Sequence, residues 1–405
     1  MEKSFLLGAA LAALAAAPAA AYDSVPLLDK LVQKNVLTSE EARQLEAGEG
    51  RGTEPLSWLA RLKFHGDLRL RSEGVDNSAQ AARQYRGRIR ARAGAEAAVT
   101  EGWTVGLGLA SGSSADSRST NQTLTSNFSK KSLWLDYAYA EREAGGFAFY
   151  GGRMHNPLWA SSDMLWDGDI NPEGAAFRLA SLAKTGFRPF AAAAWFQLDE
   201  STASVRDPSL AAAQAGLAWS GAGGLDFKAA FTYYSFGGLK GRGELANRPS
   251  TACGYIKANT LTGQVYRYSY DPVTFDLELN KDFAPLPVLK ADYLGFFGGA
   301  VKATDHSAGS TGWIAGLKFG RREVEEAGQW QLRLSQRRLE ADAWLDTYPD
   351  SDFYGGSTGV EGSEALLTLG VAHGMDVEAD YYAARRISDV SKKERLLQLD
   401  LNLKF

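Results

Sequence analysis

Arginine recurs at every second position in two short stretches of the chain. These residues are Arg69, Arg71, Arg86, Arg88, Arg90 and Arg92. Because side chains two positions apart point to the same face of a β-strand, we expect them to form basic rows on two neighbouring strands. A guanidinium stays charged at any relevant pH and offers five donors to a carboxylate or phosphate, so these rows could lower the barrier for a passing anion.

An acidic segment, residues 154–173, is the expected counterpart of the basic rows. Its carboxylates are Asp163, Asp167, Asp169 and Glu173. On a strand that descends to a turn, a rise of ~3.3 Å per residue and a tilt of ~45° put Arg92 ~19 Å and Arg86 ~33 Å above that turn. The basic rows can therefore face the acidic segment across a constriction. The alternative is that the arginines only pair with inward acids such as Asp67 and Glu96, or with the acidic segment itself.

The chain shows no residue spacing typical of a catalytic or metal site. Its 4 histidines include no pair at i and i+4, and no Gly-x-Ser-x-Gly elbow is present. Asp167-Gly-Asp169 resembles the start of a calcium loop, but Pro172 stands where that loop requires glycine and Arg178 where it requires glutamate. We therefore expect no catalytic residue, no metal and no cofactor.

The elements that must position these side chains are strands with a period of two. The last stretch alternates apolar with polar residues, in the order Leu397, Gln398, Leu399, Asp400, Leu401, Asn402, Leu403, Lys404 and Phe405. The same alternation recurs from Arg61 onward in about sixteen segments of ~10 residues. One face of each would meet lipid and the other a lumen. The pattern predicts an all-β fold, a transmembrane antiparallel β-barrel of about 16 strands.

The connections between these segments alternate in length. Tight turns are expected at 101–102, 144–145, 221–224, 284–285 and 373–374, and long connections include 112–130, 154–173 and 237–271. One of the strands that they join is expected over 287–304. An even number of strands with this alternation places both termini and the short turns on the periplasmic side, and the long loops outside.

The N-terminal region differs from the rest of the chain. Residues 1–21 combine an apolar run with an Ala-x-Ala site, which is typical of a secretory signal peptide. Residues 22–52 are predicted to form a short periplasmic helical hairpin and linker, with Thr38 and Glu41 in a capping box. The outer-membrane β-barrel is then expected to occupy residues 53–405.

Composition excludes some classes of protein. A net charge of -4, from 44 basic and 48 acidic residues, excludes a globally basic nucleic-acid binder. A single cysteine cannot form an internal disulfide. The mean hydropathy of -0.26 is low, as expected where only every second strand residue faces lipid.

Four segments give the chain a resemblance to a known family. They are LLDKLVQKNVLTSEEA, RGRIRARAGAE, EGWTVGLGLASG and GGRMHNPLWASSDMLWDGDINPEG. Together with the strand pattern they resemble the putative porin family of Gram-negative outer-membrane β-barrels, over nearly the whole chain. The resemblance implies a porin in the outer membrane of a Gram-negative bacterium. Resemblance to general porins also implies a homotrimer, and it places residues 154–173 where those proteins fold a loop into the pore.

The expected function is passive diffusion of small hydrophilic solutes or ions through a barrel that contacts outer-membrane lipid. All the residues of the basic rows and the acidic segment named above are predicted to line the pore, with a mild preference for anions. We expect no catalytic turnover. Two alternatives stay open: an outer-membrane barrel enzyme of the lipase or protease type, and a surface adhesin that uses residues 237–271.

Overall fold

The computed structural model describes residues 61–78, 80, 82–125, 127–200, 207–245 and 258–405. The chain divides into two units, Met1–Ala60 and Arg61–Phe405, and the described residues belong to the second. The predicted signal peptide (1–21) and helical hairpin (22–52) lie outside the described residues. Within the described ranges, no helix is long and apolar enough to cross a membrane.

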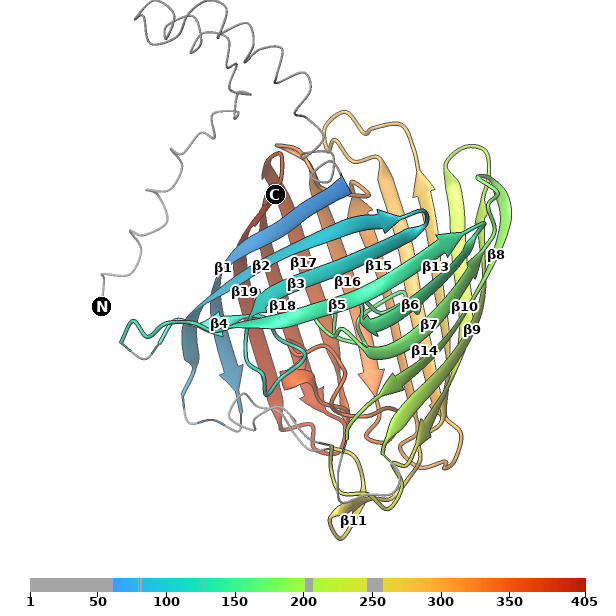
Figure 1. Ribbon diagram of the computed structural model, residues 1–405. Helices are drawn as coiled ribbons and strands as arrows, with labels where there is room; N and C mark the ends of the chain where they lie inside the picture. The colour runs from blue at the N-terminus through green and yellow to red at the C-terminus, as the bar shows by residue number, and fades with distance from the viewer. Residues whose placement is uncertain (1–60, 79, 81, 126, 201–206, 246–257) are drawn as a thin grey trace, which may run out of the picture. The chain divides into compact units, whose positions relative to one another are not determined.

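The unit Arg61–Phe405 is a closed antiparallel barrel of sixteen long strands (Figure 1). These strands are β1 (Leu62–Asn77), β2 (Gln84–Thr100), β3 (Trp103–Ser111), β5 (Leu133–Ala144), β6 (Phe147–Arg153), β7 (Glu173–Ala180), β8 (Gly186–Gln197), β9 (Ser209–Ser220), β10 (Leu225–Gly237), β13 (Pro272–Asp282), β14 (Tyr293–Ala303), β15 (Thr311–Gly320), β16 (Trp330–Leu339), β17 (Val360–Ala372), β18 (Met375–Arg386) and β19 (Lys393–Lys404). Each pairs with its neighbours along the chain, and β1 closes the ring by pairing with both β2 and β19. The predicted antiparallel barrel of about sixteen strands is confirmed.

Shorter elements lie in the connections. The strand β4 (Gln122–Thr123) pairs with β2, and β11 (Leu261–Thr262) pairs with β12 (Val265–Tyr266). The 3-10 turn η4 (Tyr354–Gly356) lies in the connection between β16 and β17.

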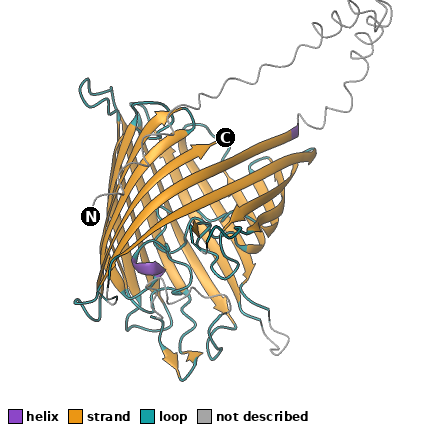
Figure 2. Ribbon diagram, turned by 90° about the vertical axis from the view of Figure 1, so that its left-hand side faces the viewer, coloured by secondary structure: helices purple, strands orange, loops and turns teal. Residues whose placement is uncertain are grey.

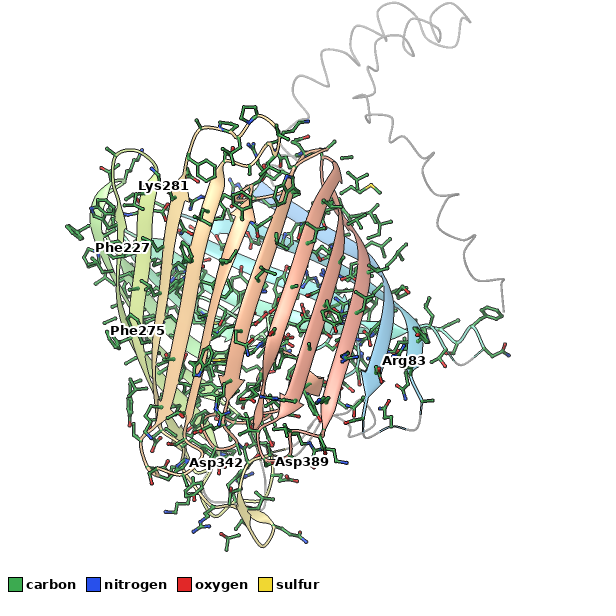
Figure 3. The ribbon with its side chains drawn as sticks, turned by 180° about the vertical axis from the view of Figure 1, so that it is seen from behind. Arg83, Phe227, Phe275, Lys281, Asp342 and Asp389 are labelled. Atoms are coloured by element: carbon green, nitrogen blue, oxygen red, sulfur yellow. The ribbon has the colours of Figure 1, made fainter. Side chains whose placement is uncertain are left out.

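The predicted alternation of lipid-facing and lumen-facing side chains is clear in β19. Leu397 and Leu399 are 45% and 49% exposed on the outer face, whereas Gln398 and Asp400 are buried on the inner one. Aromatic side chains extend the apolar outer face, and Figure 3 shows Phe227 and Phe275 on β10 and β13. The wall is therefore apolar outside and polar within, as a barrel in a bilayer requires.

The five longest connections lie at one end of the barrel, which has the connections 78–83, 112–132, 154–172, 198–208, 238–271, 304–310, 340–359 and 387–392. The other end contains every connection of five residues or fewer and is called the short-connection end; its connections are 101–102, 145–146, 181–185, 221–224, 283–292, 321–329 and 373–374. The C-terminus lies at the end with the short connections (Figure 1). Tight hairpins there depend on glycine: Gly102 and Gly374 both have a φ of 68°, a conformation that side chains with a Cβ rarely adopt.

One expected strand boundary is wrong. The segment predicted as a strand over 287–304 enters the sheet only at Tyr293, and the connection expected at 284–285 extends over 283–292. Pro285 and Pro287 have no backbone N–H to donate to a ladder. The chain there folds into a turn instead, in which Lys290 N donates to Leu286 O at 2.7 Å.

The long loops 154–172 and 340–359 fold into the barrel rather than away from it (Figure 2). Trp166 of the first loop packs edge-on against Trp344 of the second, with ring centroids 5.7 Å apart. Trp344 also packs against Tyr234 of β10 at 4.9 Å. A hydrophobic core therefore lies inside the lumen, between these two loops and the wall. The sequence predicted an inward fold only for the first loop.

Barrel closure depends on the absence of a side chain at Gly66. Gly66 N donates to Phe405 O at 2.8 Å, and Phe405 N donates to Gly66 O at 3.0 Å. A Cβ at position 66 would lie 2.5 Å from the Phe405 ring and 2.6 Å from the carbonyl oxygen of Arg92. Because the backbone oxygen cannot rotate away, we expect Gly66→Ala to lower the free energy of unfolding in detergent by about 1–3 kcal/mol, measured by urea titration.

Gly298→Ala is the matched control for that variant. It lies in β14, and its Cβ would meet only Ile314 O, at an ordinary 3.4 Å. Its free energy of unfolding should change much less. An equal decrease in the free energy of unfolding in the two variants would contradict the role of Gly66 in closing the barrel between β1 and β19.

Candidate functional site

The pairing of β1 with β2 places arginines directly opposite one another. In this register Arg69 lies across from Arg90, and Arg71 across from Arg88. Leu68, the neighbour of Arg69, is exposed on the outer face, so the arginines of this strand point into the lumen. Like charges directly opposite each other destabilise a sheet, and this wall therefore requires carboxylates between the arginines.

Three carboxylates on the strands meet this requirement, and each binds two arginines. Glu73 binds Arg86 and Arg88, Asp67 binds Arg90 and Arg92, and Asp400 binds Arg69 and Arg71. The strongest geometry is that of Arg71, which donates to both Asp400 oxygens at 2.8 Å. Glu378 of β18 also lies 3.9 Å from Arg69, so four strand carboxylates accompany the six arginines and leave a formal surplus of two positive charges on this wall.

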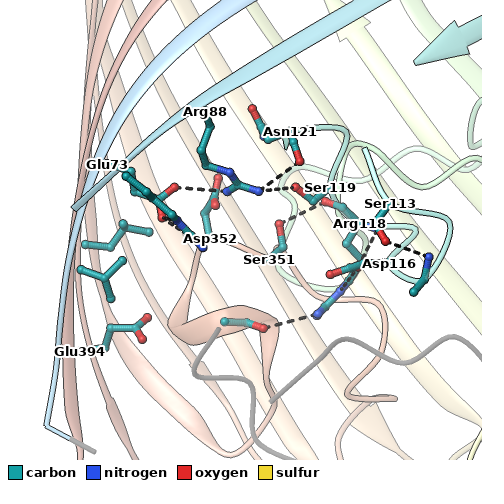
Figure 4. A pocket seen from close by; sticks show the side chains of 15 residues that line it. Glu73, Arg88, Ser113, Asp116, Arg118, Ser119, Asn121, Ser351, Asp352 and Glu394 are labelled. Atoms are coloured by element: carbon teal, nitrogen blue, oxygen red, sulfur yellow. Dashed lines mark hydrogen bonds and ion pairs between the residues drawn. The ribbon is translucent and has the colours of Figure 1, made fainter. Parts of the chain in front are cut away.

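The inward-folded loops bring further carboxylates to the same wall. Asp169 of loop 154–172 lies 3.3 Å from Arg92, and Asp352 of loop 340–359 lies 2.9 Å from Arg71. Loop 112–132 joins them, because Arg88 Nη2 donates to Ser119 Oγ at 3.2 Å (Figure 4). The surplus charge of the wall is thus offset by acidic groups from outside the strands.

The three loops also bind one another. Thr120 donates to Asp169 from both its backbone N and its hydroxyl, at 2.9 and 2.8 Å. Asp167 accepts a hydrogen bond from Ser351 N at 2.7 Å. The guanidinium of Arg118, 2% exposed, donates to the carbonyl oxygen of Gly356 at 2.6 Å. The loops therefore form one hydrogen-bonded layer across the lumen.

A second basic wall, not identified from the sequence, lies on β16. Arg333 binds Glu364 at 2.7 Å, and Arg337 binds Asp350 at 2.9 Å. Asp163 lies 3.5 Å from Arg337, so the acidic loop reaches this wall as well as the first. The signal was present in the sequence, because Arg333 and Arg337 share the inward face of a strand with a period of two.

The predicted site residues are only partly brought together. All the arginines of the two basic rows share one wall, and Asp169 alone of the predicted acids contacts them, at Arg92. Asp163 lies at the second basic wall, on β16, and Asp167 lies in the contact between loops. Glu173 binds Arg153 at 2.6 Å and is exposed.

The alternative interpretation is that these arginines only pair with inward acids such as Asp67 and Glu96. It describes part of the same wall. Asp67 does pair with Arg90 and Arg92. Glu96 instead accepts a hydrogen bond from the Tyr139 hydroxyl at 3.0 Å.

Burial perturbs the carboxyls of the loop layer. Burial and the neighbouring carboxylates raise the pKa of Asp167 well above its usual value. Burial and Asp163 raise the pKa of Asp350 to about 7, more than the nearby arginine lowers it. Asp352 is the exception: burial opposes its ionisation, but Arg71 holds its pKa at about 2. The contact with the basic wall is therefore ionic, whereas the loop layer holds carboxyls that gain protons readily.

The described residues were also compared with what a metal site, a hydrolase or an adhesin would need. Among the described residues, no group of three or more histidine, cysteine or acidic side chains could hold a metal ion. His306 Nδ1 lies 2.6 Å from Asp305, and its Nε2 has no hydrogen-bond partner in the described part of the chain. No serine hydroxyl is therefore bonded to it, as a hydrolase would need. Residues 237–271, the basis of the adhesin alternative, lie partly outside the described ranges.

Comparisons with known proteins bear on the whole barrel. A family model described as "Putative porin" matches residues 75–267 and 261–405. Among solved structures, Pseudomonas putida OprB at high pH aligns with a TM-score of 0.56 at 12% identity, over 88% of this chain and 97% of that chain. A double mutant of Rh. blastica porin gives a TM-score of 0.45 at 10% identity, over 85% of this chain and 100% of that chain. No curated protein matches the chain. The likeness to OprB shows a shared barrel fold.

The contacts with the basic wall should hold the loop layer in place. Removing one partner of such a charge pair leaves the other buried and unpaired. We expect the double variant Asp169→Asn/Asp352→Asn to be cut in its loops by a nonspecific protease roughly fivefold faster or more, as the undocked state gains population. Asp389→Asn is the control, because Asp389 bonds only within its own exposed turn, to Ser391. Equal cleavage of wild type and double variant would contradict ionic docking.

The raised carboxyl pKa gives the loop layer a pH dependence. A group whose pKa is higher in the docked state stabilises that state fully below its ordinary pKa, and the contribution is lost as pH rises through the raised value. For Asp350 this window extends from its ordinary 3.8 to about 7. Protection of backbone amides in 340–359 from hydrogen exchange, corrected for intrinsic rates, should therefore fall as pH rises through it. Asp350→Asn should flatten the dependence, and protection that increased with pH would contradict it.

Proposed function

The chain belongs to the putative porin family, and from this premise we propose that small hydrophilic solutes and ions cross its barrel by passive diffusion. It is an outer-membrane porin of a Gram-negative bacterium. The pore-lining residues in this proposal are the arginines of β1 and β2 together with Asp163, Asp167, Asp169 and Glu173. No metal or cofactor and no catalytic turnover are part of the proposal.

One observation carries the proposal: a closed ring of sixteen strands surrounds a polar lumen. A ring of eight strands would be filled by its own side chains, whereas sixteen leave room for a passage. Cavities occur on both sides of the loop layer. One of about 380 Å³ lies on the long-loop side, next to Arg153 and Thr347. Another of about 700 Å³ opens at the short connections, next to His373 and Lys404.

The mild anion preference belongs to the same proposal. Support comes from the side chains that solutes could reach. The side chains of Arg92 and Arg86 are 35% and 25% exposed. Their carboxylate partners, Asp67 and Glu73, are more deeply buried. A solute in the lumen would therefore meet more guanidinium than carboxylate along this wall.

The homotrimer also remains a proposal, by resemblance to general porins.

The channel proposal is tested by recording from the purified protein in a planar lipid bilayer. We expect stepwise, ohmic currents in potassium chloride, because ions can pass through an open polar lumen without a gating step. Assays of the same sample with ester and peptide substrates should show no turnover. Silent membranes together with hydrolysis would favour the enzyme alternative instead.

Anion preference is tested by the reversal potential across a salt gradient. The double variant Arg86→Gln/Arg92→Gln should shift it toward cation preference, because the exposed guanidinium groups are removed while Glu73 and Asp67 remain. Arg83→Gln is the control, since Arg83 lies outside the barrel wall in the 78–83 connection and pairs with Asp76. An unchanged reversal potential in the double variant would remove the preference from the proposal.

A further inference from the structure

A separate cavity lies beneath the loop layer, on the side of the short connections. It has a volume of about 360 Å³ and is bounded by β7, β8, β9 and β10 and by Pro157 and Trp159 of loop 154–172. Ligand pockets in proteins begin at roughly 300 Å³, so the space is large enough for a small organic molecule. None of the arginines of β1 and β2 lines it.

Three cationic side chains from three strands line this cavity. They are Arg178, Arg188 and Lys228. Among the described residues, no carboxylate lies within ion-pair distance of any of them, in contrast to the arginines of β1 and β2, each of which has one. Glu278 lies directly across from Lys228 in the register of β10 and β13, but its ion pair is with Lys318, at 3.7 Å. Arg188 and Lys228 are half-buried and Arg178 is exposed. Because three positive charges that line one cavity repel one another, the arrangement favours an anion between these groups.

The partners that these cations do have are neutral. Arg178 Nη1 donates to the Tyr150 hydroxyl at 3.1 Å, and Arg188 Nη2 donates to Ser220 Oγ at 2.6 Å. The Nε of Arg188 is buried and has no hydrogen-bond partner in the described structure. These bonds fix the direction of both guanidinium groups and leave donors available to a ligand.

Two aromatic rings form the apolar side of the cavity. Trp159 and Phe190 pack edge to face at 6.3 Å, and Lys228 Nζ lies 4.6 Å and 4.9 Å from their ring centroids. Gln214 holds the tryptophan segment in place, because it accepts from Trp159 N at 3.0 Å and donates to Trp159 O at 2.8 Å. The cavity is therefore preformed, with a basic part and an aromatic part.

We propose that this cavity is a subsite for small carboxylates with an aromatic body. The carboxylate would lie between Arg178, Arg188 and Lys228, and the ring would pack against Trp159 and Phe190. The inference rests on the proposed channel, because the subsite lies below the loop layer on the path to the short-connection end. A solute that crosses the layer would bind here before release. An inorganic anion would use the cations and leave the aromatic surface without a function.

Benzoate is a suitable probe, with acetate as the matched anion that lacks a ring. In a planar bilayer, benzoate should reduce the chloride current of the wild type at concentrations at least tenfold below those of acetate. The double variant Arg188→Gln/Lys228→Gln should raise the half-blocking benzoate concentration tenfold or more. Equal potency of benzoate and acetate would overturn the aromatic part of the subsite, and equal potency in wild type and variant would overturn the whole inference.

Arg83→Gln is the control variant here as well. Arg83 lies outside the barrel wall in the 78–83 connection and pairs with Asp76, so its removal leaves the cavity unchanged. Its block by benzoate should match that of the wild type. The shift in gel mobility between boiled and unboiled samples shows whether each variant has folded.

A binding titration separates this inference from the channel itself. Calorimetry with benzoate on the detergent-solubilised protein should show saturable binding that the double variant loses. Ohmic currents without benzoate binding would overturn the subsite and keep the channel. Benzoate binding without currents would overturn the channel and keep the subsite as a binding site.

Discussion

The charge on one wall of the barrel is the constraint on which the rest of the structure depends. β1 and β2 carry six arginines into the lumen, and four carboxylates of the strands lie within ion-pair distance of them. A barrel of sixteen strands is wide enough for loops to enter and offset that surplus. Asp169 and Asp352 reach the wall from different loops. The demand for negative charge at this wall therefore helps to decide where two long loops lie.

Apolar packing also holds the loops in the lumen, in addition to the ion pairs. Trp166 packs against Trp344, and Trp344 packs against Tyr234 of β10, so the loop layer joins a charged wall to an aromatic one. Below the layer the chemistry changes, because Arg178 and Lys228 line a cavity in which no carboxylate of the described residues lies within ion-pair distance of them. Along the axis a solute would meet paired charges first and unpaired cations afterwards. The paired arginines above the layer hold the loops in place, whereas the cations below it are available to bind a ligand.

The strands were predictable from sequence because the period-two pattern is local, whereas the loop positions were not. β2 and β19 lie where alternation placed them, and the error at 287–304 arose where prolines interrupt that pattern. Asp167 and Ser351, whose contact joins the loops, are separated by 184 positions, and no local pattern relates them. A partial signal existed, since Trp344 is a large apolar residue in a loop that was expected to face water. The arginine rows were visible, but their sharing of carboxylates depends on the register of three strands.

The account's central claim is that ionic contact with the arginine wall holds the loops in the lumen. A double-mutant cycle on Arg71 and Asp352, with free energies of unfolding from urea titrations in detergent, tests it most directly. Their nitrogen and oxygen lie 2.9 Å apart, and Arg71 is almost fully buried. We expect Arg71→Gln and Asp352→Asn to be non-additive, with a coupling energy of at least about 1 kcal/mol. Additive effects, with a coupling energy indistinguishable from zero, would contradict the claim.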